Sequence, residues 1–364
     1  MCRSQLHDFL HALPKCELHV HVEGCLTPDI VFDLAKKNAV NLPADEDPAF
    51  RSAQALRARY KNFSSLDDFL HYHFIGFSCL QTSEDFEYLA FTYLSRARSQ
   101  NVLHAEVFFD PQAHTVRGVP FSTIVKGLET AKKRAAIEFP DMSVAFIPCM
   151  LRHLPVASAH DLLAEAVGTG HFDDGLFVGF GMSSSEQGNH PSLYKGVFEG
   201  ARVAGISNLT AHYGEDGPAE YVAGAISELG VRRIDHGIRA IGDPALIERL
   251  ADSQTHLTLC PISNVELKTV ARLEDVPIRQ FLNAGVSFSF GSDDPGYFDC
   301  YVLENYCAVQ EAFNLNMDEW VNISRAAIKG SWCNPGRKAQ LLQALTETVS
   351  RWDLYLESAD GRLG

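Results

Sequence analysis

The sequence predicts a (β/α)8 barrel of the TIM type, in which eight parallel strands alternate with helices. Eight short β-rich runs, the helical patterns between them and a length of 364 residues favour this fold class. The alternative is a doubly wound open sheet, which usually has fewer strands and a Gly-x-Gly-x-x-Gly turn that this chain lacks. We therefore expect a single domain spanning residues 1–364.

The strands are predicted from runs that are rich in β-branched and aromatic residues and end in turn-forming residues. In chain order they cover residues 16–23, 102–111, 143–150, 176–182, 208–215, 233–237, 256–264 and 286–294. Helical periodicity separates these runs, and several of the helices have proline near their start. The predicted helices include residues 192–204, 218–229, 244–251 and 277–284.

Two further helical regions add to the repeating pattern. Residues 27–95 are mostly helical and follow the first strand, so we expect an insertion that covers the mouth of the barrel. After the last strand, residues 301–314, 317–332 and 335–357 are helical in pattern, which predicts additional C-terminal helices within residues 301–364. The chain has no internal repeat and no linker rich in Gly, Ser or Pro.

Composition limits the class of partner. With 46% hydrophobic and 21% charged residues the chain resembles ordinary globular proteins, and its net charge of −15 argues against nucleic acid or an anionic membrane as a partner. Nine cysteines without a Cys-x-x-Cys pair favour a reducing compartment, and the polar N-terminus does not resemble a signal peptide. We expect a cytoplasmic protein, with the nucleus also open to it, that binds a small molecule; the oligomeric state is left open.

His19 and His21 are the first sign of a functional site. They lie on the predicted first strand, where residues two apart point to the same face, so both imidazoles should reach one place. Two converging imidazoles are half of a metal site. His71 and His73 have the same spacing, but they lie in a helical pattern and should not share a face, so we interpret them as structural.

The ends of later strands supply the other half. His212 and Glu215 end the fifth strand, His236 the sixth, and Asp293 and Asp294 the eighth. Functional residues of such barrels gather at these C-terminal ends. Three imidazoles and a carboxylate bind a divalent metal and leave a position for water. Each residue alone also suits a core position or a turn, but their joint placement favours a site.

Five motifs in order resemble the adenosine/adenine deaminase family of metal-dependent amidohydrolase barrels over nearly the whole chain. They are ELHVHVEG (17–24), HYGE (212–215), RIDHG (233–237), CPISN (260–264) and SDDP (292–295). The resemblance implies one zinc ion per chain, with the ligands His19, His21, His212 and Asp293. It also implies that Glu215 protonates N1 of a purine, that His236 orients the attacking water, and that Asp294 meets N7.

These roles suit hydrolytic deamination. Attack at C6 of an aminopurine breaks aromaticity, and zinc activates water by lowering its pKa to about 7. Glu215 then needs a raised pKa, which burial would give, so that it can neutralise charge at N1. The other class of zinc deaminase has His-x-Glu followed by Pro-Cys-x-x-Cys, and no such cysteine pair follows here.

Several stretches resemble the adenine deaminase branch of the family: residues 105–112, 184–189, 217–221, 263–267 and 297–298. The branch implies an adenine aminohydrolase, a hydrolase acting on C–N bonds of cyclic amidines, which converts adenine to hypoxanthine and ammonia in purine salvage and nucleotide metabolism. Glu23 and Glu186 are expected to bind substrate by crowding the side of the pocket where a ribose would lie. The alternative for both is a surface or supporting role.

Three departures from that branch leave the substrate open. Tyr213 replaces its usual Ala, Ser183 its usual Asp and Gly291 its usual Asn. Gly291 either enlarges a wall of the pocket or meets a backbone requirement. N6-substituted adenines and adenosine are therefore alternative substrates. A catalytically inactive purine-binding barrel is disfavoured because the ligands and the acid are intact, and a hydrolase of amides or phosphoesters would lack Glu215 and Asp294.

Overall fold

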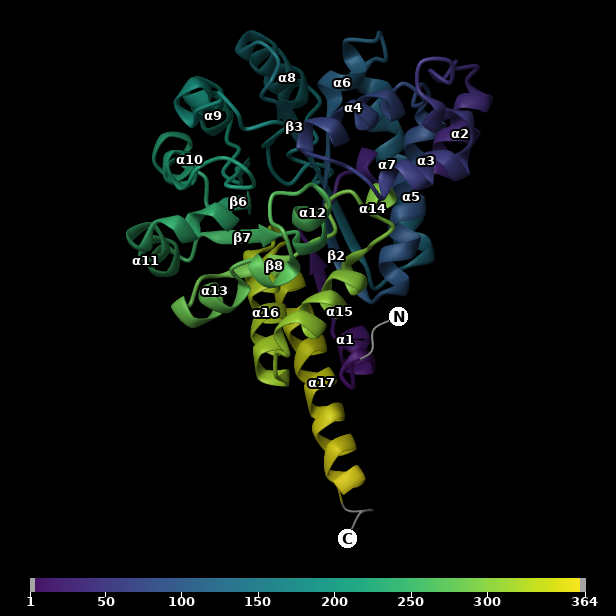
Figure 1. Cartoon of the computed structure of the whole chain (residues 1–364). Helices are drawn as coiled ribbons and strands as arrows, with labels where there is room; N and C mark the ends of the chain where they lie inside the picture. Colours follow the sequence, from purple (N-terminus) through teal and green to yellow (C-terminus); the bar gives the residue numbers. More distant parts are fainter. Residues whose placement is uncertain (1–3, 361–364) are drawn as a thin grey trace.

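The computed structural model describes residues 4–360 and contains eight parallel strands (Figure 1). They are β1 (Lys15–Glu17), β2 (Val102–Phe109), β3 (Ser143–Leu151), β4 (Gly181–Ser183), β5 (Thr210–Tyr213), β6 (Arg233–His236), β7 (His256–Leu259) and β8 (Phe288–Phe290). Strands β1 to β4 form one hydrogen-bonded group in chain order, and β5 to β8 form a second.

Single bridges join the two groups into a closed barrel. Phe180 pairs with Leu209 between β4 and β5, and Val20 pairs with Asp293 between β1 and β8. At the second junction the backbone N–H of His21 donates to the carbonyl of Asp293 over 2.9 Å. The predicted TIM-type barrel is confirmed.

Most strands are shorter than predicted, because the chain leaves the ladder where the polar residues begin. The predicted first strand extends to residue 23, but β1 ends at Glu17 and a 3-10 turn forms at Glu23–Cys25. The seventh was expected to reach residue 264, but α12 (Pro261–Glu266) begins there instead. Pro261 at the first helical position is a signal for a helix start that the β-rich run obscured.

Helices follow the successive strands from β2 onward. They are α6 (Pro111–Thr115), α7 (Phe121–Glu138), α8 (Val156–Gly168), α9 (Lys195–Val203), α10 (Ala219–Gly224), α11 (Pro244–Ser253), α12, α13 (Ile278–Ala284) and α14 (Pro295–Phe298). The helix predicted at 218–229 continues past α10 as a π-helical turn at Ala225–Leu229.

The two additional helical regions are helical as predicted. Between β1 and β2 lie α2 (Pro28–Lys37), α3 (Ala53–Tyr60), α4 (Leu66–Phe77) and α5 (Ser83–Ser99). At the ends of the described chain lie α1 (His7–Ala12), α15 (Val302–Phe313), α16 (Met317–Gly330) and α17 (Pro335–Asp360). In Figure 1, α17 extends away from the barrel. Residues 361–364 of the expected C-terminal region lie outside the described residues, and the assignment of the whole chain to one domain stays a prediction.

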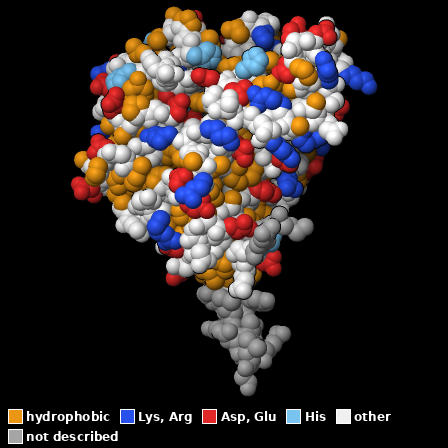
Figure 2. Space-filling model, viewed as in Figure 1, with side chains coloured by type: hydrophobic (Ala, Val, Ile, Leu, Met, Phe, Trp, Pro, Cys, Tyr) orange, Lys and Arg blue, Asp and Glu red, His pale blue; other side chains and the backbone are white. Residues whose placement is uncertain are grey.

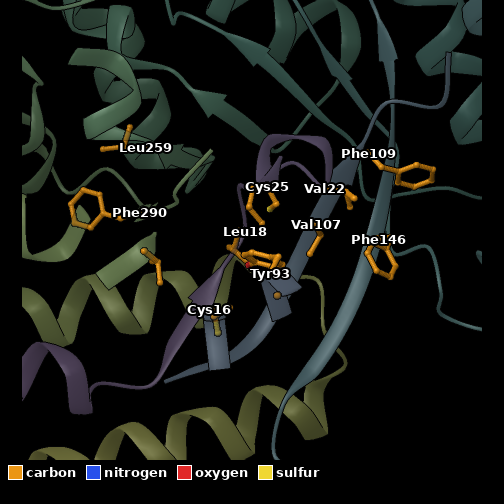
Figure 3. Packing of buried hydrophobic residues seen from close by; sticks show 14 of the residues in the cluster. Cys16, Leu18, Val22, Cys25, Tyr93, Val107, Phe109, Phe146, Leu259 and Phe290 are labelled. Carbon is orange, nitrogen blue, oxygen red and sulfur yellow. The ribbon is translucent and has the colours of Figure 1, made fainter. Parts of the chain in front are cut away.

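The core continues along the extended segment after β1 into the site. Leu18, Val20 and Val22 alternate with the histidines and are completely buried. Figure 3 shows Leu18 and Val22 packed near Tyr93 of α5 and Val107 of β2. The apolar side chains thus fix this segment from behind while the imidazoles face the other way, as predicted.

The surface agrees with the composition. On the face in Figure 2, Lys and Arg side chains are interspersed with Asp and Glu rather than gathered in one broad basic area. None of the helices in residues 4–360 combines the length and the apolar character needed to cross a membrane.

Gly291 meets a backbone requirement where β8 approaches the first strand. A Cβ atom at this position would lie 2.3 Å from the carbonyl oxygen of His19 and 2.8 Å from its Cβ. Since the nearest obstacle is backbone, it cannot turn away as a flexible side chain can. Gly291 is expected either to enlarge a wall of the pocket or to meet a backbone requirement. The structure supports the backbone requirement.

We predict that Gly291→Ala destabilises the fold by about 2 kcal/mol, the usual cost of forcing an extra group into a packed interior. The measurement is urea unfolding. Gly168→Ala is the control, because a Cβ there has no atom within 4 Å. Equal stability of the two variants would contradict the close approach.

Candidate active site

A cavity lies at the C-terminal ends of the strands, beneath α4. Strands β1, β5, β6 and β8 bring polar residues to it, the ends of β2 to β4 form another wall, and α4 forms an apolar roof. The lining residues are His21, Leu66, Phe69, Leu70, His73, Phe74, Asp110, Leu151, Ser183, Ser184, His212, Glu215, His236, Leu267, Asp293 and Asp294.

Four of the predicted residues converge at the base of this cavity: His19, His21, His212 and Asp293. One potential ligand atom from each lies within 4.8 Å of the others, and all four residues are buried. Asp293 Oδ1 is 3.1 Å from His19 Nε2 and 3.5 Å from His21 Nε2. The segments that follow β1 and β8 therefore bring together residues that are far apart in the sequence.

Hydrogen bonds behind two imidazoles turn their lone pairs toward the centre. His212 Nδ1 lies 2.9 Å from the carbonyl of Met182, which only accepts, so this nitrogen carries the proton. His19 Nδ1 similarly faces the carbonyl and hydroxyl of Thr258. Both Nε2 atoms are then unprotonated and available to a metal.

The donor set fits a divalent metal ion. His21 Nε2 lies only 3.1 Å from His212 Nε2, where two lone pairs would repel without a cation or a proton near them. Three imidazole nitrogens and one carboxylate oxygen are ligands that zinc accepts readily. The predicted ligand residues are thus assembled in a way that suits a metal.

Asp235 supports this centre from below. Its carboxylate accepts hydrogen bonds from Thr210 and Thr258, over 2.7 and 2.9 Å, and lies 3.3 Å from His212 Nδ1. Burial alone would raise the pKa of Asp235, but His212 and the hydrogen bonds outweigh burial and lower the pKa. An ionised Asp235 therefore orients His212 directly and His19 through Thr258, an arrangement typical of metal-binding histidines.

Glu17 fixes the loop that carries Asp293. Its carboxylate accepts from the backbone N–H of Ser292 over 3.0 Å, from the Ser292 hydroxyl, and from Tyr93 of α5 over 2.7 Å. Asp293 itself has a left-handed backbone, with φ of 61°, and so does His236, with φ of 65°. Such conformations are unfavourable for residues other than glycine, and surrounding contacts must hold them.

Glu215 has the properties expected of a proton donor. It is buried at the cavity wall, and its Oε1 has no hydrogen-bond partner among the described residues. Burial raises its pKa well above the usual value, and the negative charges of Asp293, Asp216 and Glu186 raise it further. The pKa of Glu215 is thus raised, as the sequence leads us to expect.

His236 lies between the acid and the proposed metal ligands. Its Nε2 is 3.6 Å from Glu215 Oε2 and 3.7 Å from Asp293 Oδ2. Its Nδ1 is 3.4 Å from the amide nitrogen of Asn264, which can donate to it and so leave the proton on Nε2. Burial lowers the pKa of His236, which keeps the ring neutral.

Asp294 faces the cavity beside a glycine that makes room for it. A Cβ on Gly24 would lie 2.2 Å from Asp294 Oδ1, so no larger residue fits there without movement. Asp294 Oδ1 has no hydrogen-bond partner in the described part of the chain, which leaves it available to a ligand.

The sequence predicts a structural role for His73, and the structure corrects this prediction. The helix was predicted, and the two histidines do not share a face: His71 is exposed and His73 is buried. However, His73 lines the cavity, with Nε2 3.9 Å from Asp294 Oδ1. Its apolar neighbours on α4 made it look like a core residue, and only the docking of α4 onto the barrel reveals its position.

Glu23 and Glu186 are buried behind the cavity wall and are absent from its lining. Glu23 Oε1 accepts from His114 Nε2 and from the backbone N–H of Asp110. Glu186 accepts from the backbone N–H groups of Gly214, Glu215 and Asp216 at 2.8, 2.7 and 3.2 Å. These bonds turn both carboxylates toward backbone, which corrects their expected place along the pocket; the structure gives them supporting contacts.

Tyr213 and Ser183, the other two departures from the adenine deaminase branch, differ in their position relative to the cavity. Tyr213 alternates with His212 and points away from the cavity, where its hydroxyl donates to the carbonyl of Asn189 over 2.9 Å. Its ring packs 4.4 Å from the guanidinium of Arg152, which in turn donates to the carbonyls of Ser183 and His212. Only Ser183 lines the cavity.

Comparison with known proteins places the chain in a family. The family model described as "Adenosine deaminase" matches residues 14–348. The chain belongs to the adenosine deaminase family. A relative from Aspergillus oryzae named "Adenine deaminase" is 50% identical over 351 residues, which cover 96% of this chain and 99% of the relative.

Two solved structures agree with this assignment. An adenine deaminase from Arthrobacter aurescens is 36% identical with a TM-score of 0.87, and the match covers 93% of this chain and 99% of that one. An amidohydrolase from Burkhoderia ambifaria, solved with bound Zn, is 25% identical with a TM-score of 0.84 and covers 98% of each chain.

We predict that Thr258→Val weakens metal binding by about 10- to 100-fold, because it removes the hydroxyl that links His19 to Asp235. Competition with a chelator, followed by metal analysis, measures the loss. Thr255→Val is the matched control, since Thr255 is also buried but bonds to Ser253 outside the site. Equal metal affinities for the two variants would contradict the proposal that Asp235 supports His19 through Thr258.

Proposed function

We propose that this chain is a zinc-dependent adenine aminohydrolase, which hydrolyses adenine to hypoxanthine and ammonia. The observation that carries the proposal is the position of Glu215, a buried carboxyl with a raised pKa and an unpartnered Oε1, beside the proposed ligands of one metal ion. The adenine deaminases of A. oryzae and A. aurescens support adenine as the substrate. The Zn-containing relative supports zinc as the metal.

The proposed ligands are His19, His21, His212 and Asp293. A zinc ion bound there would supply a water molecule activated for attack near neutral pH. The purine would lie with C6 toward this centre, where Glu215 reaches N1 and Asp294 reaches N7. Contacts on both sides of the ring would fix its plane, and such positioning contributes directly to rate.

Proton movements follow from the side chains at hand. As C6 is attacked, electron density moves to N1, and Glu215 donates its proton there. His236 would hold the attacking water by donating its Nε2 hydrogen to the water oxygen, a task that suits the neutral ring that burial favours. Of the two protons of the water, one would leave with the amine as ammonia and the other would restore the proton that Glu215 gave to N1. The apolar roof of α4, including Phe69 and Phe74, excludes bulk water from the reaction.

The departures from the adenine branch do not favour a different reaction. Gly291 is explained by its contact with the backbone of His19, and Tyr213 points away from the cavity. Ser183 alone touches the space where substrate binds. A role in purine salvage and a cytoplasmic location stay predictions.

Glu215→Gln tests the role of the acid. We expect the variant to retain its metal and its fold but to lose about 10²- to 10⁴-fold in turnover of adenine, because an amide cannot donate a proton to N1 as a carboxylic acid does. Ammonia release and metal content are measured together. Glu220→Gln, on the exposed side of α10, is the matched control. Near-normal activity of Glu215→Gln would overturn the assignment.

A substrate panel tests the choice of adenine. Ammonia or amine release is compared for adenine, N6-methyladenine, isopentenyladenine, adenosine and deoxyadenosine. We expect adenine to have the highest kcat/KM. A higher value for adenosine, or for either N6-substituted base, would contradict the proposal while leaving the deamination chemistry intact.

A further inference from the structure

A polar pair stands on the wall opposite the catalytic residues. Asp110, directly after β2, and Ser183, at the end of β4, both line the cavity and are each only 3% exposed. The Ser183 hydroxyl donates to Asp110 Oδ1 over 2.9 Å. In the closed barrel β2 and β4 lie across from β6 and β8, which carry His236 and precede Asp294.

The second carboxylate oxygen of Asp110 is available to a ligand. Oδ1 is occupied by Ser183, whereas the structure gives Oδ2 no hydrogen bond among the residues it describes. The adjacent Ser184 hydroxyl is already bonded to His153 Nδ1 over 2.6 Å. Asp110 Oδ2 is thus the acceptor that this wall offers.

A buried chain of hydrogen bonds holds Asp110 in place. Arg117 can only donate, so its contact with His114 Nδ1 leaves the His114 proton on Nε2, which donates to Glu23 Oε1 over 2.8 Å. The same Glu23 oxygen accepts from the backbone N–H of Asp110 over 3.1 Å. Glu23 is completely buried, so Asp110 cannot retreat from the cavity without breaking this chain.

The same series of hydrogen bonds extends to α4, which forms the roof of the cavity. Arg117 donates to the carbonyl of Phe77, at the C-terminal end of α4, over 2.8 Å. Asp110 is therefore tied to α4 through Arg117, His114 and Glu23, and to β4 through Ser183. A side chain fixed from two directions has a definite position relative to a bound ring.

The orientation of the purine decides what Asp110 meets. With C6 at the metal, N1 at Glu215 and N7 at Asp294, the remaining polar edge of adenine carries N3 and N9–H. In the free base N9–H is a donor, whereas in a nucleoside N9 carries the ribose and offers no hydrogen. An acceptor at that edge would distinguish the two.

We infer that Asp110, oriented by Ser183 and by the Glu23–His114–Arg117 chain, selects the free base by accepting a hydrogen bond from N9–H. The inference rests on the proposed function, since it takes the orientation of adenine from that site. Glu23 then influences the choice of substrate without touching it. Burial and the charge of Glu23 raise the pKa of Asp110, while the Ser183 hydroxyl and a ligand N–H both favour its ionised form.

The test compares adenine with 9-methyladenine, which lacks N9–H, in the wild-type chain and in Asp110→Asn. We expect the wild type to prefer adenine by about 100-fold in kcat/KM. In Asp110→Asn, an amide N–H replaces the acceptor, so kcat/KM for adenine should fall about 10- to 100-fold while 9-methyladenine changes little. The preference should therefore shrink by the same factor. Asp252→Asn, exposed on α11, is the matched control.

The comparison separates recognition of N9–H from simple exclusion of bulk. If the methyl group were rejected only for its size, the preference for adenine would be unchanged in Asp110→Asn, and the inference would be overturned while the proposed function stands. If the wild type deaminated no aminopurine at all, the proposed function itself would fail. Should Asp110→Asn not fold, Ser183→Ala replaces it, with an expected 3- to 10-fold loss of preference, about what one neutral hydrogen bond supplies.

Discussion

Asp235 is the point on which the geometry of the site depends. Its carboxylate accepts from Thr210 and Thr258 and lies against His212, so one buried anion connects β5, β6 and β7 beneath the proposed metal. His19 Nδ1 donates to Thr258, whose hydroxyl Asp235 holds, and His212 Nδ1 faces both the Met182 carbonyl and Asp235. Together these contacts turn both Nε2 atoms toward the proposed metal.

The cavity also concentrates carboxyl groups whose surroundings differ. Interaction with His19 and His236 lowers the pKa of Asp293 despite its burial. Burial raises the pKa of Asp294 and of Glu215, and the nearby charge of Asp293 raises both further. This separation gives neighbouring acids different tasks: one suits a cation, and another suits proton donation. The same chemistry explains why an acid such as Glu215 is buried rather than placed on the surface.

The sequence predicted the barrel because strand and helix periods alternate, and it predicted the residues at the strand ends because polar groups there interrupt apolar runs. It could not predict which side chains support the site from behind or from above. Asp235 lies in the RIDHG motif, but the sequence assigns it no role. The strand pattern alone does not show that Thr210 and Thr258 flank it. His73 belongs to an apolar helix face, and only the position of α4 over the barrel turns that face into a roof.

Glu23 and Glu186 illustrate a similar limit. Their place next to functional motifs suggested contact with substrate, yet each carboxylate faces backbone N–H groups: Glu23 that of Asp110, and Glu186 those of the Glu215 loop. A sequence shows that an acid lies near a site but does not show which way it points. The sequence allows two interpretations of Gly291 for the same reason, because the approach of His19 comes from the other end of the chain.

Titration of the metal-free chain with zinc tests the central claim most directly. The protein is stripped with a chelator, its metal content is verified, and adenine deamination is followed as zinc is returned. We predict no activity in the stripped protein and full recovery at one zinc per chain. Full activity without metal, or recovery that requires two ions per chain, would contradict it.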